Sequence, residues 1–139
     1  MTDELTMLLD HVALSVADLD LAGRFYEAVL APLGLSVVST LPSDAHAGGQ
    51  VGFGIGRKGQ LWLVAKGQQQ PPCHIAFRNG SRAAVRAFHA AALAHGGSDN
   101  GAPGIRQAYH PEYYAAFVRD PEGHNVEAVT FAPEAAAQT

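Results

Sequence analysis

The feature that most constrains this chain is an internal repeat: the string His11-Val-Ala-Leu14 returns as His74-Ile-Ala-Phe77, and later residues match at the same offset. Half of a 139-residue chain is too small to close a good core alone, so two copies of one unit must bury their hydrophobic faces together. The repeat therefore predicts one domain built from two similar modules. The other matched pairs include Phe25 and Phe88, Leu30 and Leu93, and Gly34 and Gly97.

Each module is predicted to run as a strand, a helix and then three strands. In the first module, aliphatic residues alternate from His11 to Val16, which is typical of a half-buried strand. Asp18 can accept hydrogen bonds from the free amides of the next turn, so it is the expected N-cap of a helix that ends at Pro32 and Gly34. The three following strands are predicted at 35–41, 50–55 and 60–65.

The second module repeats this order with one weaker segment. A strand is predicted at 74–77, a helix capped by Ser81 stops at Gly96 and Gly97, and two strands follow at 113–118 and 125–131. Residues 99–104 are expected to form a turn-rich loop. The predicted fold class is α+β, with two tandem βαβββ modules that form a curved mixed sheet with a shared concave site. The single domain spans 1–139, with modules at about 8–66 and 73–132.

Composition excludes several classes of function. Charged residues make up 16% of the chain, the net charge is -4 and no basic cluster stands out, so no nucleic-acid partner is expected. The apolar stretches are too short to span a membrane, and the first nine residues do not resemble a signal peptide. The one cysteine, Cys73, rules out an intrachain disulfide, so a cytoplasmic location is expected.

Alternation along the strands places three potential metal ligands on one kind of sheet face. The aliphatic residues of each first strand suit the face beneath the helix, so His11 and His74 point to the opposite face. Glu127 takes that face in the last strand, where a carboxylate among apolar residues is costly without a partner. Two imidazoles and one carboxylate suit Fe(II), Mn(II), Zn(II) or Ni(II) and leave coordination positions open. His11, His74 and Glu127 are therefore the predicted ligands of a divalent metal.

Structural interpretations of the same residues stay open at this point. A histidine at a strand end can bond to the backbone, and Glu127 can pair with Arg78 or Arg106 instead of a metal. Trp62 is more often a core residue than a platform for substrate. His124, beside a hairpin turn, is expected to be solvated.

Several longer strings carry a family resemblance that spans nearly the whole chain. The strings are Asp10-His-Val-Ala-Leu-Ser-Val-Ala-Asp18 with Phe25-Tyr26 and Leu33-Gly34, then His74-Ile-Ala-Phe77, and finally Tyr114-Ala-Ala-Phe-Val-Arg-Asp-Pro-Glu-Gly-His-Asn-Val-Glu-Ala128. With them the chain resembles the vicinal-oxygen-chelate superfamily of glyoxalases, bleomycin-resistance proteins and extradiol dioxygenases. The resemblance implies the βαβββ fold and a closing hairpin that ends in the ligand Glu127. It implies no single reaction, because this fold hosts isomerases, dioxygenases, transferases, epimerases and metal-free drug-binding proteins.

The chain also differs from the families that it resembles at positions that matter for the reaction. Glyoxalase I enzymes usually carry a fourth ligand, Glu or Gln, in the last strand of the first module. Matching Gly59 to Gly123 places Leu63 opposite Glu127, and the neighbouring residues Leu61, Trp62 and Val64 are also apolar. Fosfomycin-modifying transferases place Thr where this chain has Ala13. Extradiol dioxygenases often add a histidine and a tyrosine near the metal, and His110, Tyr113 and Tyr114 could fill those roles.

The predicted function is that of a divalent-metal-dependent enzyme that chelates a small substrate through two neighbouring oxygens, of the lyase, isomerase or dioxygenase type. The alternative is a metal-free protein that binds a small or drug-like molecule. A homodimer is expected, with the site completed within or across chains. The predicted catalytic residues are His110, Tyr113 and Tyr114, and the predicted substrate-binding residues are Trp62, Arg106 and Asn125.

Overall fold

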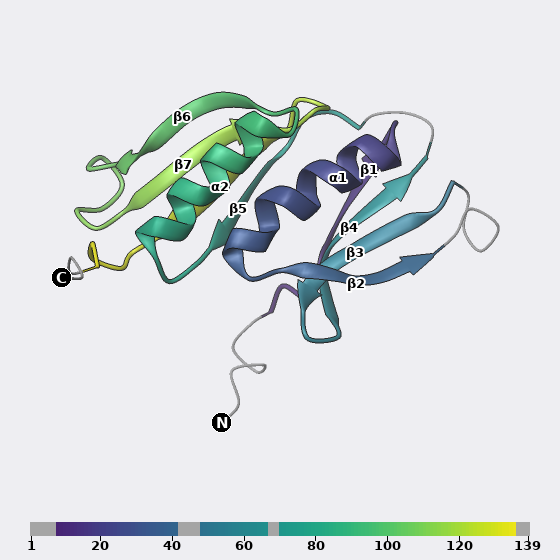
Figure 1. Ribbon diagram of the computed structural model, residues 1–139, viewed down its shortest axis with the longest axis horizontal. Coiled ribbons are helices and arrows are strands. Elements are labelled where there is room, and N and C mark those ends of the chain that lie inside the picture. Colours follow the sequence, from purple (N-terminus) through teal and green to yellow (C-terminus); the bar gives the residue numbers. More distant parts are fainter. Residues whose placement is uncertain (1–7, 42–47, 67–69, 136–139) are drawn as a thin grey trace.

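The computed structural model describes residues 8–41, 48–66 and 70–135 of the chain, which form two modules of the same construction (Figure 1). Each module folds into its own four-stranded mixed sheet, in the orders β1-β4-β3-β2 and β5-β8-β7-β6. The α+β class and the two tandem βαβββ modules are thus confirmed. The first module contains β1 (Val12–Val16), α1 (Leu19–Leu30), the short 3-10 helix η2 (Ala31–Leu33), β2 (Ser36–Leu41), β3 (Gln50–Ile55) and β4 (Lys58–Ala65). The second contains β5 (His74–Arg78), α2 (Arg82–Ala94), β6 (Ser98–Ile105), β7 (Tyr114–Arg119) and β8 (Asn125–Thr130).

The two helices begin at the residues that the sequence indicated. The Asp18 side chain accepts a hydrogen bond from the Leu21 amide at 3.0 Å, and the Ser81 hydroxyl accepts one from the Ala84 amide at 3.1 Å. Each cap satisfies an amide that the first helical turn leaves free, which stabilises a helix by about 1 kcal/mol. Gly34 adopts a φ of 90° after η2 and turns the chain into β2, a conformation that residues with a side chain rarely adopt.

The helices lie side by side in the middle of the molecule and are flanked by the two sheets (Figure 1). Apolar side chains from both helices and from the helix-facing side of both sheets fill one continuous core. We call the other side of each sheet, away from its own helix, the open face. The largest fully buried apolar residues are Phe25, Tyr26, Phe53, Phe88, Leu14, Leu30, Leu61 and Leu63.

One predicted element is wrong, because residues 99–104 form most of strand β6 instead of a loop. The strand pairs with β7 across two register shifts, between Asp99 and Gly101 and between Gly101 and Gly104. Gly101 has a φ of 152°, and its Cα approaches the Phe117 ring, where a Cβ would lie 2.9 Å from a ring carbon. β6 is an edge strand, so its polar and glycine-rich sequence lacks the alternation that marks a half-buried strand.

The turn between β7 and β8 joins the two modules. Asp120 is 6% exposed, and its Oδ2 accepts a hydrogen bond of 2.5 Å from the Tyr26 hydroxyl of α1. The Glu122 carboxylate accepts hydrogen bonds from the amides of Ala17 and Asp18 at the start of α1. These contacts cross from the second module to the first, so the turn docks the modules as well as closing a hairpin.

His124 lies in this same turn and corrects a second expectation, because it is fully buried and not solvated. Its Nδ1 accepts a hydrogen bond from the Cys73 amide at 3.1 Å, and its own amide donates to Asp120 at 2.9 Å. The turn folds back against the first module, which removes the histidine from water. Over the residues that the structure describes, no helix is long and apolar enough to cross a membrane.

Candidate functional site

Glu127 is the centre of the candidate site, on the open face of the second-module sheet. Alternation along β8 sends Val126 and Ala128 toward the helix and Glu127 to the other side. The carboxylate is only 1% exposed, yet both of its oxygens have partners. Oε1 lies 2.8 Å from Nε2 of His74, and Oε2 accepts a hydrogen bond from the Tyr113 hydroxyl. A buried carboxylate is tolerated only with such partners.

Strand pairing brings these residues together from distant parts of the sequence. β5 and β8 are parallel neighbours in which His74 pairs with Asn125 and Ala76 pairs with Glu127. The His74 side chain, half exposed, crosses to the buried carboxylate. On the other side of β8, Phe117 of β7 is the register partner of Glu127. Two of the three predicted metal ligands, His74 and Glu127, therefore meet in the structure.

Tyr113 is the predicted catalytic residue that joins them. It ends a folded segment in which the Arg106 amide donates to the Tyr113 carbonyl at 2.7 Å and the Tyr109 amide donates to the Arg106 carbonyl at 3.0 Å. Partial burial and the hydrogen bond to Glu127 raise the pKa of the Tyr113 phenol to about 12. The hydroxyl keeps its proton at neutral pH, so Tyr113 acts as a hydrogen-bond donor toward the carboxylate and not as a base.

Of the other two predicted catalytic residues, His110 shares the Phe131 ring with Tyr113, whereas Tyr114 lies on the other side of the sheet. His110 packs its ring against Phe131, with centroids 5.5 Å apart, and its Nδ1 accepts a hydrogen bond from the Glu112 amide. That bond leaves only Nε2 for chemistry. Tyr114 is on the helix-facing side of β7, is 8% exposed and accepts a hydrogen bond from Arg86 of α2. It thus belongs to the core side of the sheet, away from Glu127.

His11, the third predicted ligand, stands apart from His74 and Glu127 within one chain. Its Nδ1 donates to the Asp10 carboxylate at 2.6 Å, and Lys58 also donates to that carboxylate. These hydrogen bonds lower the pKa of Asp10. An imidazole that donates from Nδ1 presents Nε2 as its free nitrogen, which is the arrangement that metal-bound histidines commonly have.

A pocket of about 630 Å³ lies beside His11, between the two modules. One wall comes from the start of β1 and from β4, and the facing wall comes from β5, including Ala76, the register partner of Glu127. Most of its surface is apolar. The lining residues are Leu9, Asp10, His11, Val12, Lys58, Gln60, Leu61, Ile75, Ala76 and Phe77.

The position that matches Glu127 in the first module is Trp62, one residue before the Leu63 that matching the glycines indicated. Ala13 pairs with Trp62 in β1 and β4, as Ala76 pairs with Glu127 in β5 and β8. Leu63 is fully buried in the core, whereas the partly exposed Trp62 lies on the open face. The conclusion that this position is apolar still holds, because an indole replaces the carboxylate.

The indole of Trp62 lies over bare backbone. A Cβ built on Gly52 would come within 2.6 Å of the ring, and one built on Gly59 within 2.7 Å. The other predicted substrate-binding residues lie on the open face of the second module. The guanidinium carbon of Arg106 is 5.3 Å from the centroid of the Phe117 ring, and the Asn125 side chain accepts a hydrogen bond from Asn100.

The donor set fits a divalent metal in part. An imidazole and a carboxylate that share one hydrogen bond can instead share a cation, since both are ligands of transition metals. Across 8–41, 48–66 and 70–135, however, no three His, Cys, Asp or Glu side chains lie close enough together to hold a metal ion. His74 and Glu127 therefore form two thirds of the predicted set, and the third ligand has to come from outside this pair.

Comparison with known proteins bears on this arrangement. A family model described as Glyoxalase/Bleomycin resistance protein/Dioxygenase superfamily matches residues 8–128. The chain belongs to this superfamily. No curated protein shows significant similarity to this glyoxalase-superfamily chain.

Solved structures agree with the family assignment. A glyoxalase/bleomycin resistance protein from Albidiferax ferrireducens is 27% identical, with a TM-score of 0.72, over 89% of this chain and 98% of that one. A lactoylglutathione lyase from Agrobacterium tumefaciens is 26% identical, with a TM-score of 0.60, over 86% and 90%. A family enzyme from Burkholderia phytofirmans, 18% identical over 88% and 98% with a TM-score of 0.65, shares the fold.

Sequence reasoning missed some of the residues that shape this glyoxalase-superfamily site. Asp10 orients His11, and its place directly before a predicted ligand was the available signal. Phe131, the residue after β8, packs against both Tyr113 and His110, and continued alternation from Glu127 could have placed it on the open face. Glu127 bonds to His74 and Tyr113 and not to the arginines that the sequence offered as alternative partners. No sequence pattern indicates this choice, because it depends on the direction of each side chain.

Proposed function

We propose that this chain is a divalent-metal-dependent enzyme that binds a small molecule through two neighbouring oxygens at the open face of the second module. The observation that supports the proposal most is Glu127, a nearly fully buried carboxylate held between His74 and Tyr113. Burying a carboxylate on a sheet face lowers the stability of the fold, but together with the exposed imidazole of His74 it forms a pair of metal ligands. The bound metal would supply Lewis-acid polarisation of the substrate oxygens.

The residues of the chain have separate roles in this proposal. His74 and Glu127 would hold the metal, and Tyr113 fixes the orientation of Glu127 by donating to Oε2. The Tyr113 hydroxyl has a single proton, so it can donate either to Glu127 or to a substrate oxygen that gains negative charge, one at a time. Phe117 lies beside Glu127 in the neighbouring strand and Phe131 packs against Tyr113, and these apolar rings would limit the access of water to the carboxylate.

We further propose that His11 of a second copy completes the site. Within one chain His11 lies away from His74, but Asp10 already holds its ring with Nε2 available. Among the residues that the structure describes, β1 and β5 are both edge strands with an unpaired side, and the neighbouring Leu8 and Leu9 are 94% and 77% exposed. Unpaired edges and exposed leucines are features that a second copy would cover.

Metal analysis of the purified protein tests the site. One transition metal per chain is expected in the wild type, and His74→Ala and Glu127→Ala should each lose it. His89→Ala is the matched control, because His89 also pairs with a carboxylate, Asp99, at 2.8 Å but lies on α2. Full metal content in Glu127→Ala would contradict the assignment.

Mixing two inactive variants tests whether the site crosses chains. His11→Ala and Glu127→Ala homodimers should each lack metal. In a mixture, each mixed dimer regains one intact site if His11 acts on its partner, so about a quarter of the full metal content should return. No recovery after subunit exchange would show that the ligands act within one chain.

A metal-free binding protein is the second candidate, and one observation favours it. His74, Tyr113 and Glu127 satisfy one another by hydrogen bonds without any cation, and Trp62 occupies the position of a possible fourth ligand. Such a protein would take up a flat apolar molecule in the pocket between the modules. Ligand binding that survives both metal removal and Glu127→Ala would select this function.

A further inference from the structure

Arg78 places a positive charge on the same open face as His74 and Glu127. The two residues His74 and Arg78 are four apart on β5 with Ala76 between them, and alternate residues of a strand share a face. Since Ala76 is the register partner of Glu127 and Arg78 that of Val129, Arg78 stands roughly 7 Å further along the strand than Glu127. This distance is within the length of a small substrate.

The Arg78 guanidinium is held by two aromatic rings beside the site, Phe131 and, through it, Tyr113. Its carbon lies 4.8 Å from the centroid of the Phe131 ring. The same ring packs against Tyr113, with centroids 5.4 Å apart, and Tyr113 donates to Glu127. Stacking on a ring fixes the plane of a guanidinium while leaving its N–H edges free, so Arg78 is positioned as a hydrogen-bond donor.

The Arg78 guanidinium remains available to a ligand. Over the ranges that the structure describes, Arg78 has no ion pair and no hydrogen bond, whereas Arg82 pairs with Glu112 and Arg86 with Glu134. Arg106, above Phe117 on the other flank, donates to the carbonyls of Ala102 and Gly104 and to no carboxylate. The charge of Arg106 is also offset by the nearby Asp99 carboxylate, so Arg78 is the better placed of the two guanidinium groups to attract an anionic ligand.

We propose that Arg78 binds a carboxylate of the substrate, so that the substrate is a small organic acid whose two neighbouring oxygens lie at the opposite end. A guanidinium matches a carboxylate with two parallel N–H···O bonds, a fit that a lysine cannot reproduce. The inference rests on the proposed function for the oxygen-binding end of the molecule. It assigns Arg78 as a specificity residue for the other end.

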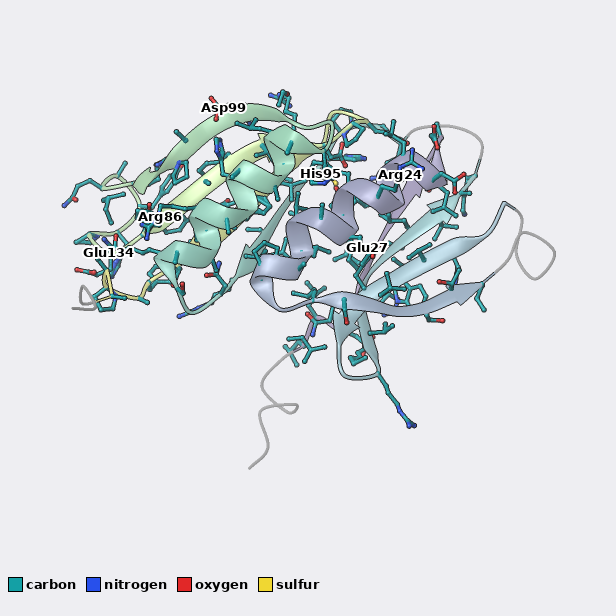
Figure 2. The ribbon with its side chains drawn as sticks, viewed as in Figure 1. Arg24, Glu27, Arg86, His95, Asp99 and Glu134 are labelled. Carbon is teal, nitrogen blue, oxygen red and sulfur yellow. The ribbon has the colours of Figure 1, made fainter. Side chains whose placement is uncertain are left out.

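Two probes that differ only in a carboxylate test this inference. Catechol and 3,4-dihydroxybenzoate are titrated by calorimetry into the full chain, both loaded with Mn(II) and metal-free. The wild type should bind the acid about tenfold more tightly, as expected for a partly exposed charge-assisted pair. Arg78→Met should bind the two probes equally, and Arg78→Lys should keep a smaller preference. The control is Arg24→Met, on α1 of the other module (Figure 2), which should behave as the wild type.

The outcomes separate this inference from the proposed function. Equal binding of both probes by the wild type, or a preference that persists in Arg78→Met, would overturn the assignment of Arg78. Glu127→Ala should weaken both probes and preserve their ratio. If the acid is preferred through Arg78 but neither Glu127 nor metal affects binding, the assignment of Arg78 stands and the metal-dependent function is wrong.

Discussion

Replacing Tyr26 by phenylalanine tests the contact that docks the two modules. Tyr26 is fully buried on α1, and its hydroxyl donates to Asp120 Oδ2 at 2.5 Å. Burial raises the pKa of this phenol well above 10, so the hydroxyl remains a donor at any ordinary pH. Tyr26→Phe keeps the ring in the core and removes only the hydrogen bond.

The magnitude follows from the burial of both partners. Asp120 is 6% exposed, so Oδ2 loses its donor with little water to replace it, while Oδ1 keeps the amides of Glu122 and His124. A hydrogen bond to a charged group contributes about 1.5–3 kcal/mol, so Tyr26→Phe should lower the free energy of unfolding by about that amount. At roughly 3 °C per kcal/mol for a chain of this length, Tm should fall by about 5–9 °C.

Urea denaturation and calorimetry measure this change. Tyr109→Phe is the matched control, because Tyr109 is 68% exposed and its loss should change stability by less than about 0.5 kcal/mol. A double-mutant cycle with Asp120→Asn should give a coupling energy of about 1–3 kcal/mol between the two residues. A Tyr26→Phe protein as stable as the wild type would refute the view that this contact joins the modules.

Three further predictions concern other parts of the molecule. Gly52→Ala should displace the Trp62 indole, since the new Cβ would lie 2.6 Å from it, and should shift the tryptophan fluorescence to the red. The control is Gly23→Ala, because a Cβ at Gly23 would have nothing within 4 Å. This control should leave the fluorescence unchanged and stabilise α1 by about 0.5–1 kcal/mol. Ser81→Ala should cost about 1 kcal/mol by urea denaturation through loss of the α2 cap, and an unchanged midpoint would contradict the capping role. The hydrogen bond from Arg86 lowers the pKa of Glu134, and the two side chains lie side by side in Figure 2. The stability from this pair is present above the unfolded pKa of about 4.5 and is lost as pH falls through the lower folded value, so an NMR titration of Arg86→Met should show the Glu134 pKa returning upward.

The fold was predictable because local pattern and repeat agree. Alternation gave the faces of β1, β5 and β8 correctly, including the direction of Glu127, and the cap residues gave the helix starts. The two wrong predictions concern residues whose structure depends on contacts with segments distant in the sequence. His124 is buried because its turn docks on α1, and β6 forms because β7 offers it hydrogen bonds.

The candidate site was predictable only in part for the same reason. Matching the hairpin glycines misaligned β4 by one residue, because β4 has 8 residues and begins before Gly59, whereas β8 has 6 and begins after Gly123. The separation of His11 from His74 depends on how the modules pack, and α1 packs against α2 by contacts that no local motif specifies. The alternation of side chains along a strand predicts which face of its sheet a residue occupies, but it does not predict which faces of the two modules lie together.

Trp62 gives this chain a built-in reporter. It is the single tryptophan of the sequence, and it lies partly exposed on the open face of the first module, at the position that Glu127 holds in the second. Its emission therefore reports on that surface without interference from another indole. A second copy or a flat aromatic ligand that covers it would shift the emission to the blue or quench it, so either kind of association can be followed on the unlabelled protein, in real time and at low concentration.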